Sequence, residues 1–536
     1  MNEASATLVA KPEPSIFAEY NWTKIGLIAA VCFLVLLDGV NGSMSSTLGP
    51  YLMGSFAITP DQVAWTAIFY YTPKLYGLLL AARLQERFGQ RRALLFASTV
   101  LVLATGFSFF VTNYPSLLVV RLLQGSGGGL MIALGQGALL AAFSRREQPL
   151  VQCAFALAAV MFPANIVPAL LGGFAYNDDW QHAYAWTTLG GLLGCGWLFW
   201  KQKILGDITV STPVPIVRIC LMVTALFAIV YVVEQGNRHA WLESPYIVWS
   251  LLLAGVCLLG IGFAESDGGP TYLRYHCFRY SNFTFGLSLS LLAGIAIFGS
   301  GNVIPGFTAG VLAYPVWQTG LVQLSAAVFA TLSLLIVGVT LRLTKFPGIL
   351  VVLLGLLMFG VAVWKLGQAP SDADFGGLVP WLILRGLALG CQFLPLTLMT
   401  LTCLPITDDV AAAGLFNFGR QLGALAGVAW MQTLHEHLTD RNQTVFGEAL
   451  SWASPNAVSY VQHAQNALEW HGLAPAQAPP IAVALTLQEA QRQMSSVAFN
   501  GCFQALAMLF LFSFPLILLA RILTARFLKP QHENES

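Results

Sequence analysis

Long apolar segments recur along the whole chain, and each is long enough to cross a lipid bilayer. A spanning helix needs about 20 mostly apolar residues, and fourteen segments meet this requirement. They lie near residues 25–50, 62–83, 91–112, 115–143, 149–175, 182–200, 217–235, 246–264, 284–307, 315–340, 347–365, 379–403, 409–434 and 498–527. An even number of spans places both termini on the same side of the membrane.

The composition supports a membrane fold and excludes several classes of function. Of the 536 residues, 56% are hydrophobic and 10% are charged, whereas a soluble domain carries about 25% charged residues. A net charge of +1 provides no basic surface for nucleic acid. The nine cysteines include no Cys-x-x-Cys pair, and the eight histidines fall in expected loops or tails, so we expect no metal site and no cofactor. Because the sequence has no Walker motif and no catalytic set within a span, we do not expect an enzyme.

The distribution of lysine and arginine predicts how the chain is oriented. Eighteen of these 26 residues lie in the N-terminal leader and in alternate loops, and four lie in the loops between them. Because loops rich in Lys and Arg stay in the cytoplasm, residues 1–24 are expected to be a cytoplasmic leader and residues 531–536 a cytoplasmic tail. Residues 435–497 then form a long non-cytoplasmic loop, which is either simply solvated or a docking surface for a partner. Within it, residues 487–491 predict a helix on the membrane surface.

Two opposite charges lie in the middle of the first two spans, where a charge costs at least about 2.5–3.5 kcal/mol. Asp38 either carries protons or recognises a cation, or it forms a structural ion pair with Lys74 or an arginine. Lys74 either holds a substrate carboxylate or neutralises Asp38. Tyr70 and Tyr71 lie one turn before Lys74 and offer hydroxyl groups and ring faces. We therefore take Lys74, Tyr70 and Tyr71 as candidates for substrate binding.

Four further charges fall within spans. Arg121 precedes a glycine-rich segment, and Arg385 precedes a similar one much later in the chain, which suggests an internal repeat. Glu234 lies at the end of the seventh span and is either solvated at the interface or part of a proton path. Arg420 is either a link between helices or a contact to substrate. Arg385 and Arg420 complete the set of candidates for substrate binding.

The loop after the second span resembles a signature of the major facilitator superfamily. It reads Ala82-Arg83-Leu84-Gln85-Glu86-Arg87-Phe88-Gly89-Gln90-Arg91-Arg92, and the family pattern is Gly-x-Leu-x-Asp-Arg-x-Gly-Arg-Arg. Here Ala82 stands for the first Gly and Glu86 for the Asp. The resemblance implies a cytoplasmic gate that latches one half of the protein against the other, formed by Glu86, Arg87, Gly89, Arg91 and Arg92.

Further motifs are similar to those of the fourteen-helix drug:proton antiporters of the EmrB/QacA type within this superfamily. They are Arg121-x-x-Gln124-Gly125-x-Gly127 in the fourth span, Pro168-Ala169-Leu170-Leu171-Gly172-Gly173 in the fifth, Glu234-Gln235-Gly236 before the eighth and Arg279-Tyr280-Ser281-Asn282-Phe283-Thr284 before the ninth. In that family the fifth-span motif, here Pro168, Gly172 and Gly173, marks export. The resemblance also implies that Asp38, Arg121 and Glu234 take part in proton coupling.

This resemblance covers nearly the whole chain and implies an all-α polytopic membrane protein with the major facilitator fold. Residues 25–200 and 271–530 would form two six-helix bundles, and residues 201–270 would add two inserted spans. The implied function is proton-coupled export of small amphipathic molecules by alternating access across a bacterial inner membrane. A periplasmic adaptor and an outer-membrane channel are the implied partners.

Three alternatives stay open at the level of the sequence. The first is a specific importer or exporter of an anionic metabolite or siderophore. The others are an integral membrane enzyme and a sensor that does not transport. Because Lys74 is not a feature of the antiporter family, an anionic or zwitterionic substrate is a further hypothesis.

Overall fold

The computed structural model describes residues 22–167, 170, 180–200, 216–266, 274–344, 347–404, 408–449 and 455–527, and its regular structure in these ranges is helical. The longer helices are α1 (Trp22–Phe56), α2 (Pro60–Phe88), α3 (Gln90–Phe107), α4 (Tyr114–Ala142), α8 (Trp180–Trp200), α9 (Ile216–Gln235), α10 (Pro245–Ser266), α11 (Ser281–Gly294), α12 (Ser300–Gly310), α13 (Val316–Leu343), α14 (Gly348–Leu366), α15 (Phe375–Leu401), α16 (Asp409–Ala449), α17 (Pro455–Trp470) and α18 (Ala478–Phe527). Shorter segments are α5 (Gln148–Ala156), the π-helical η2 (Leu157–Met161), α6 (Phe162–Asn165), the 3-10 helix η5 (Tyr275–Arg279) and the π-helical η6 (Ile295–Gly299).

Ten helices in the described part of the chain are long and apolar enough to cross a membrane. They are α1, α3, α4, α9, α10, the continuous unit from α11 to α12, α13, α14, α15 and α18. Helices α2, α8 and α16 also occupy expected spans, but they are not among these ten. The remaining expected span corresponds to α5, η2 and α6, and most of its second half lies outside the described residues. The all-helical fold is confirmed, whereas the count of fourteen spans stays a prediction.

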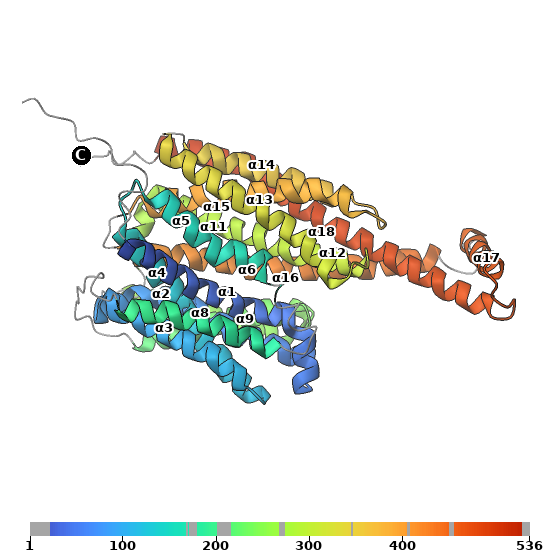
Figure 1. Cartoon of the computed structure of the whole chain (residues 1–536), viewed down its shortest axis with the longest axis horizontal. Helices are drawn as coiled ribbons and strands as arrows, with labels where there is room; N and C mark the ends of the chain where they lie inside the picture. The colour runs from blue at the N-terminus through green and yellow to red at the C-terminus, as the bar shows by residue number, and fades with distance from the viewer. Residues whose placement is uncertain are drawn as a thin grey trace, which may run out of the picture.

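The helices form two groups that lie side by side (Figure 1). Helices α1–α4 and α8 pack together in the first group, and α11–α16 and α18 pack together in the second. Each group contains a pair in close contact, α2 with α4 and α13 with α15, and glycines make both contacts possible. A Cβ at Gly125 would lie 2.0 Å from the Tyr70 carbonyl oxygen, and one at Gly386 would lie 2.3 Å from the Ala326 carbonyl oxygen. This parallel supports the predicted internal repeat.

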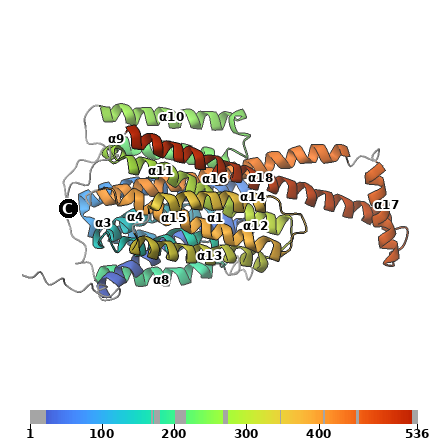
Figure 2. The same ribbon diagram turned by 90° about the horizontal axis from the view of Figure 1, so that it is seen from above.

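Helices α9 and α10 pack against each other, and α9 also packs against α2. Figure 2 shows α10 at the outer edge of the molecule. Its side chains Val256, Leu259 and Phe263 are 66%, 65% and 74% exposed, as expected for a helix that faces lipid. This placement supports the predicted division into two bundles with an inserted pair, which stays a prediction.

Residues 435–497 form a helical arm rather than a loop. The arm consists of the end of α16, the whole of α17 and the beginning of α18, and it projects away from the bundle (Figures 1 and 2). Residues 487–491 are helical, as predicted, but they lie inside α18, which continues without interruption into the bundle, rather than in a helix along the membrane surface. Pro479 and Pro480 stand in the first turn of α18, where proline is tolerated, and good helix formers follow them.

The two ends of the bundle differ in their connectors. The end opposite the arm carries the arginine-rich connector between α2 and α3 and the start of α16. We call this the basic end and the other the arm end.

Candidate functional site

A buried ion pair joins α1 and α2 within the first helix group. Lys74 Nζ lies 2.7 Å from Asp38 Oδ2, and the two side chains are 7% and 2% exposed. The Tyr70 hydroxyl lies 2.7 Å from Asp38 Oδ1 and 3.1 Å from Lys74 Nζ. Two partners therefore offset the desolvation of this carboxylate. The structure shows that Lys74 does neutralise Asp38, which is one of the two readings of the sequence.

The glycine-rich segment of α4 makes room for this ion pair. A Cβ at Gly128 would lie 1.7 Å from Asp38 Oδ1, and one at Gly129 would lie 2.1 Å from the Lys74 carbonyl oxygen. Distances this short are impossible for real atoms, so only glycine allows α4 to approach α1 and α2 this closely. The glycines that follow Arg121 in the sequence are therefore needed for this close packing of helices.

Arg121 is fully buried and binds neutral acceptors. Its NH1 group donates to the Asn41 carbonyl oxygen at 2.6 Å and to Gln124 Oε1 at 3.0 Å, and its Nε donates to the Thr66 carbonyl oxygen at 3.2 Å. The guanidinium carbon lies 4.2 Å from the centroid of the Tyr70 ring. Arg121 thus ties α1, α2 and α4 together directly behind the ion pair. We refer to Asp38, Lys74, Tyr70 and Arg121 as the Asp38 cluster.

Tyr71 and Glu234 lie at the edge of this cluster. The rings of Tyr70 and Tyr71 are 5.1 Å apart, and the Tyr71 hydroxyl donates to the Gly42 carbonyl oxygen at 3.3 Å. Glu234 is partly buried near the end of α9, within electrostatic range of the Tyr71 hydroxyl and of Arg238. No contact among the described residues joins Glu234 to Asp38.

Arg420 is a further buried cation, and it belongs to the second helix group. It lies in α16, is 5% exposed and is within electrostatic range of Asp38. Its guanidinium carbon lies 5.2 Å from the centroid of the Phe393 ring. Within the described residues, the Arg420 side chain makes no hydrogen bond and no ion pair. It is a buried cation in need of an acceptor.

Arg385 is separate from the cluster. It is 1% exposed in α15, and its Nε donates to Ser300 Oγ at 3.0 Å. Its NH1 group has no hydrogen-bond partner among the described residues. No contact in this part of the chain joins Arg385 to Asp38, so the two predicted substrate arginines occupy different environments.

A set of charges holds the two helix groups together at the basic end. The Arg274 guanidinium binds both Glu86, at the end of α2, and Asp408, just before α16. Arg83 NH1 lies 2.9 Å from the second oxygen of Glu86. Partial burial alone would lower the pKa of Arg274, but its hydrogen bonds to Glu86 and Asp408 and their charges raise this pKa above its ordinary value. We call Glu86, Arg274 and Asp408 the latch.

The sequence predicted Glu86 as part of a gate but missed its two partners. Arg274 follows Glu86 by 188 residues in the chain and Asp408 by 322, and only the fold brings the three together. Of the other predicted gate residues, Gly89 has φ 85°, a conformation that favours glycine, and joins α2 to α3. Arg87 lies over the Phe88 ring at 5.6 Å, whereas Arg91 and Arg92 are partly and fully exposed at the start of α3.

A chain of buried amides reinforces the closure at the basic end. Asn417 Nδ2 in α16 donates to Gln136 Oε1 in α4 at 2.6 Å, and Gln136 Nε2 donates to Gln152 Oε1 in α5 at 2.9 Å. The cavity between Leu79 and Leu415, beneath the latch, holds only about 10 Å³. The described residues therefore pack the two helix groups tightly together at the basic end. The sequence did not predict this contact, although Gln136 and Gln152 are visible in it as polar residues within apolar spans.

The fifth span contains an irregular helix beside Asp38. The π-helical segment η2 packs against α1, and a Cβ at Gly39 would lie 2.2 Å from Pro163 Cγ. Because π-helical turns interrupt regular packing, they are common at functional sites. The predicted export motif of Pro168, Gly172 and Gly173 lies outside the described residues.

One group of possible metal ligands gathers next to the latch. Ligand atoms of His276, Cys277 and Asp408 lie within 4.8 Å of one another, an arrangement that the sequence did not predict. Both carboxylate oxygens of Asp408 are already engaged, one by Arg274 and one by His276 at 2.7 Å. We therefore describe these residues as part of the ion-pair network.

The histidines are also more often helical than expected. His182 lies in α8, His435 and His437 lie in α16, and His463 lies in α17. The expectation that all eight fall in loops or tails is wrong, mainly because the arm is helical.

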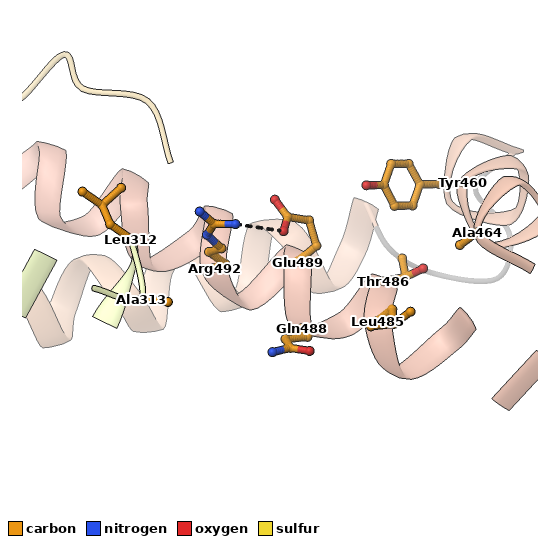
Figure 3. Close-up of a pocket in the computed structure, with 9 residues that line it drawn as sticks. All are labelled: Leu312, Ala313, Tyr460, Ala464, Leu485, Thr486, Gln488, Glu489 and Arg492. Atoms are coloured by element: carbon orange, nitrogen blue, oxygen red, sulfur yellow. Dashed lines mark ion pairs between the residues drawn. The ribbon is translucent and has the colours of Figure 1, made fainter. Parts of the chain in front are cut away.

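A groove of about 530 Å³ lies at the base of the arm. Figure 3 shows residues of α17 and α18 around it, with Arg492 pointing toward Glu489. Arg492 Nε and NH2 donate to the carbonyl oxygens of Val311 and Ser371 at 2.8 and 2.6 Å. These bonds fix α18 to two connectors of the second helix group.

Comparisons with known proteins identify the family. The sequence model of the Major Facilitator Superfamily matches residues 31–428. The chain belongs to the major facilitator superfamily. It is therefore a multi-pass membrane transporter and not an enzyme.

Similar proteins carry names that denote resistance, export or transport. The fatty acid resistance protein FarB of Neisseria gonorrhoeae is 24% identical over 502 residues, which cover 93% of this chain and 96% of FarB. The multidrug export protein EmrB of Haemophilus influenzae is 23% identical over 409 residues, which cover 75% of this chain and 79% of EmrB. Among solved structures, the human organic anion transporter MFSD10 aligns with a TM-score of 0.55 at 12% identity, covering 92% of this chain and 99% of that one. At that identity the alignment shows the fold alone.

Proposed function

We propose that this transporter exports small amphipathic molecules in exchange for protons, by alternating access. The observation that carries the proposal is the buried contact between Asp38 and Lys74. As a carboxylate, Asp38 attracts the Lys74 ammonium group. As a neutral acid, it no longer does, because protonation removes the negative charge. Proton uptake therefore changes the charge at the contact between α1 and α2. Arg121 positions this contact through Tyr70, and Glu234 would act at its edge.

The direction of transport is proposed from the relatives and from the distribution of charge. FarB and EmrB carry names that denote resistance and export. Because Arg-rich connectors lie at the basic end, we place this end in the cytoplasm of a bacterial inner membrane, together with both termini. The latch and the amide chain then close the cytoplasmic side. Opening toward the cytoplasm would require the Arg274 contact to Glu86 and the Asn417 contact to Gln136 to break.

The arm is proposed as a docking surface for a periplasmic adaptor that leads to an outer-membrane channel. On the orientation given above, the arm lies on the non-cytoplasmic side. It exposes large apolar side chains beyond the bundle, including Trp470 at 92%, Tyr460 at 56% and Val445 at 57%. Apolar side chains exposed in this way favour contact with another protein.

Everted membrane vesicles that contain a pH-sensitive dye test the proposed exchange. After the vesicles are energised, a panel of cationic, zwitterionic and carboxylate compounds is added to wild type, to Asp38→Asn and to vesicles without the protein. We expect at least one compound to release protons from wild-type vesicles and not from the other two. If no compound moves protons through a folded and inserted protein, proton exchange is excluded and uptake assays would follow.

A further inference from the structure

We propose that the substrate is zwitterionic and amphipathic, with its acidic group bound by Arg420 and Lys74 and its basic group bound by Asp38. This inference rests on the proposed function and names the class of substrate for the same site. Its basis is the balance of charges between the two helix groups. The internal ion pair of Asp38 and Lys74 would be exchanged for two ion pairs with the substrate.

An acidic group is required because the site holds more cations than anions. Lys74 and Arg420 are each 5% exposed, and Asp38, at 2%, is the buried carboxylate that lies within reach of both charges. Arg420 has no acceptor within the described residues. A buried guanidinium without an acceptor is costly, and a substrate carboxylate supplies the bidentate acceptor that arginine prefers.

A basic group is required by the direction of proton movement. A simple anion would take Lys74 from Asp38, so Asp38 would gain a proton as the anion binds. Proton and anion would then move in the same direction, which is the opposite of exchange. A simple cation would bind Asp38 but leave both Lys74 and Arg420 without an acceptor. A zwitterion competes with the proton for Asp38 and provides an anion for the cations.

The surroundings of Arg420 favour an apolar remainder of the substrate. Phe393 lies against the Arg420 guanidinium. Phe416, one turn before Arg420 in α16, is also buried. Aromatic and aliphatic walls of this kind bind the apolar part of an amphipathic molecule, while a few charged groups fix its orientation.

Three probes of equal chain length test the inference on the purified full-length protein. They are N-decylglycine as the zwitterion, decanoate as the anion and decyltrimethylammonium as the cation. Binding is measured through the thermal stabilisation that each probe gives at increasing concentration. We expect N-decylglycine to bind most tightly, and Arg420→Gln to weaken its binding about tenfold or more because a charged contact is lost. Arg420→Lys should retain part of the affinity, and Lys365→Gln, at an exposed lysine of the arm end, should have no effect.

A second variant distinguishes ligand binding from general damage to the fold. In Asp38→Asn, Lys74 loses its internal partner, so the variant should bind N-decylglycine more weakly and decanoate more tightly than wild type does. Opposite changes for two ligands cannot come from unfolding. Tightest binding of decyltrimethylammonium, or equal binding of N-decylglycine by wild type and Arg420→Gln, would overturn the inference. Proton release by decyltrimethylammonium that depends on Asp38 would leave proton exchange intact and refute only the zwitterionic substrate.

Discussion

Asp38 and Lys74 are each costly to bury alone, and their contributions to the stability of the protein therefore depend on each other. Removal of one partner from a buried ion pair costs about 3–5 kcal/mol, because the other charge is left uncompensated. We expect Asp38→Asn and Lys74→Gln each to lower the melting temperature of the purified protein. The double variant should be less destabilised than the sum of the two single variants. The exposed pair of Arg238 and Asp61, with side chains 38% and 64% exposed, serves as a control whose loss costs at most about 1 kcal/mol.

Additive effects of the two single substitutions would contradict this coupling. In that case the two side chains would contribute to stability independently, and protonation of Asp38 would not weaken the contact between α1 and α2.

Gly128 sets the space that Asp38 occupies. A Cβ at this position would lie 1.7 Å from Asp38 Oδ1, so Gly128→Ala must displace either the carboxylate or α4. We expect this variant to insert into the membrane but to lose transport in the vesicle assay. Gly255→Ala in α10 is the matched control, because a Cβ there has open space around it. Normal transport by Gly128→Ala would show that the observed position of Asp38 is not the functional one.

The latch and the amide chain act at the scale of helices, since they join the end of α2 and the C-terminal part of α4 to the start of α16. Glu86→Gln removes the charge that Arg274 binds from the first helix group. We expect this variant to open more often at the basic end. Cysteines introduced along the inner face of α16 near that end should then react faster with a membrane-impermeant thiol reagent in everted vesicles. Lys365→Gln, far from the latch, should leave the rate unchanged, and an unchanged rate in Glu86→Gln would argue against a closing role for the latch.

Individual elements differ in how far the sequence predicts them. Apolar length alone predicts the strongly hydrophobic spans, because lipid requires continuous helices. Apart from residues 487–491, the arm was predicted as a loop, since its helices are polar and are held by contacts such as those of Arg492 to the Val311 and Ser371 carbonyl oxygens. These contacts join distant parts of the chain and have no local signal.

The residues of the site could be predicted from the sequence, but their arrangement could not. An isolated charge within an apolar span is visible in the sequence, so Asp38, Lys74 and Arg420 could be identified in advance. The pairing of Asp38 with Lys74 was one of the alternatives, and the sequence could not decide between them because the pairing depends on the rotation of each helix about its axis. Arg274 and Asp408 lie in connectors, where charges are common, and therefore did not stand out.

At the scale of the whole molecule, the arm should be needed only for export across the complete cell envelope. If residues 455–470, which form α17, are replaced by a short Gly/Ser linker, the bundle loses no helix of its core. We expect normal proton exchange in everted vesicles and loss of resistance in intact cells that depend on an adaptor. Full resistance in these cells would exclude the tip of the arm as the docking surface.

Competition between substrate and proton for Asp38 is the central claim for the whole molecule. It is tested most directly by the dissociation constant of the purified protein for N-decylglycine, or for any compound active in vesicles, measured from acidic to neutral pH. We predict that binding by wild type weakens as the pH falls and that the residual binding by Asp38→Asn does not change with pH. Wild-type binding that is independent of pH, or an equal pH dependence in Asp38→Asn, would contradict this account of proton coupling.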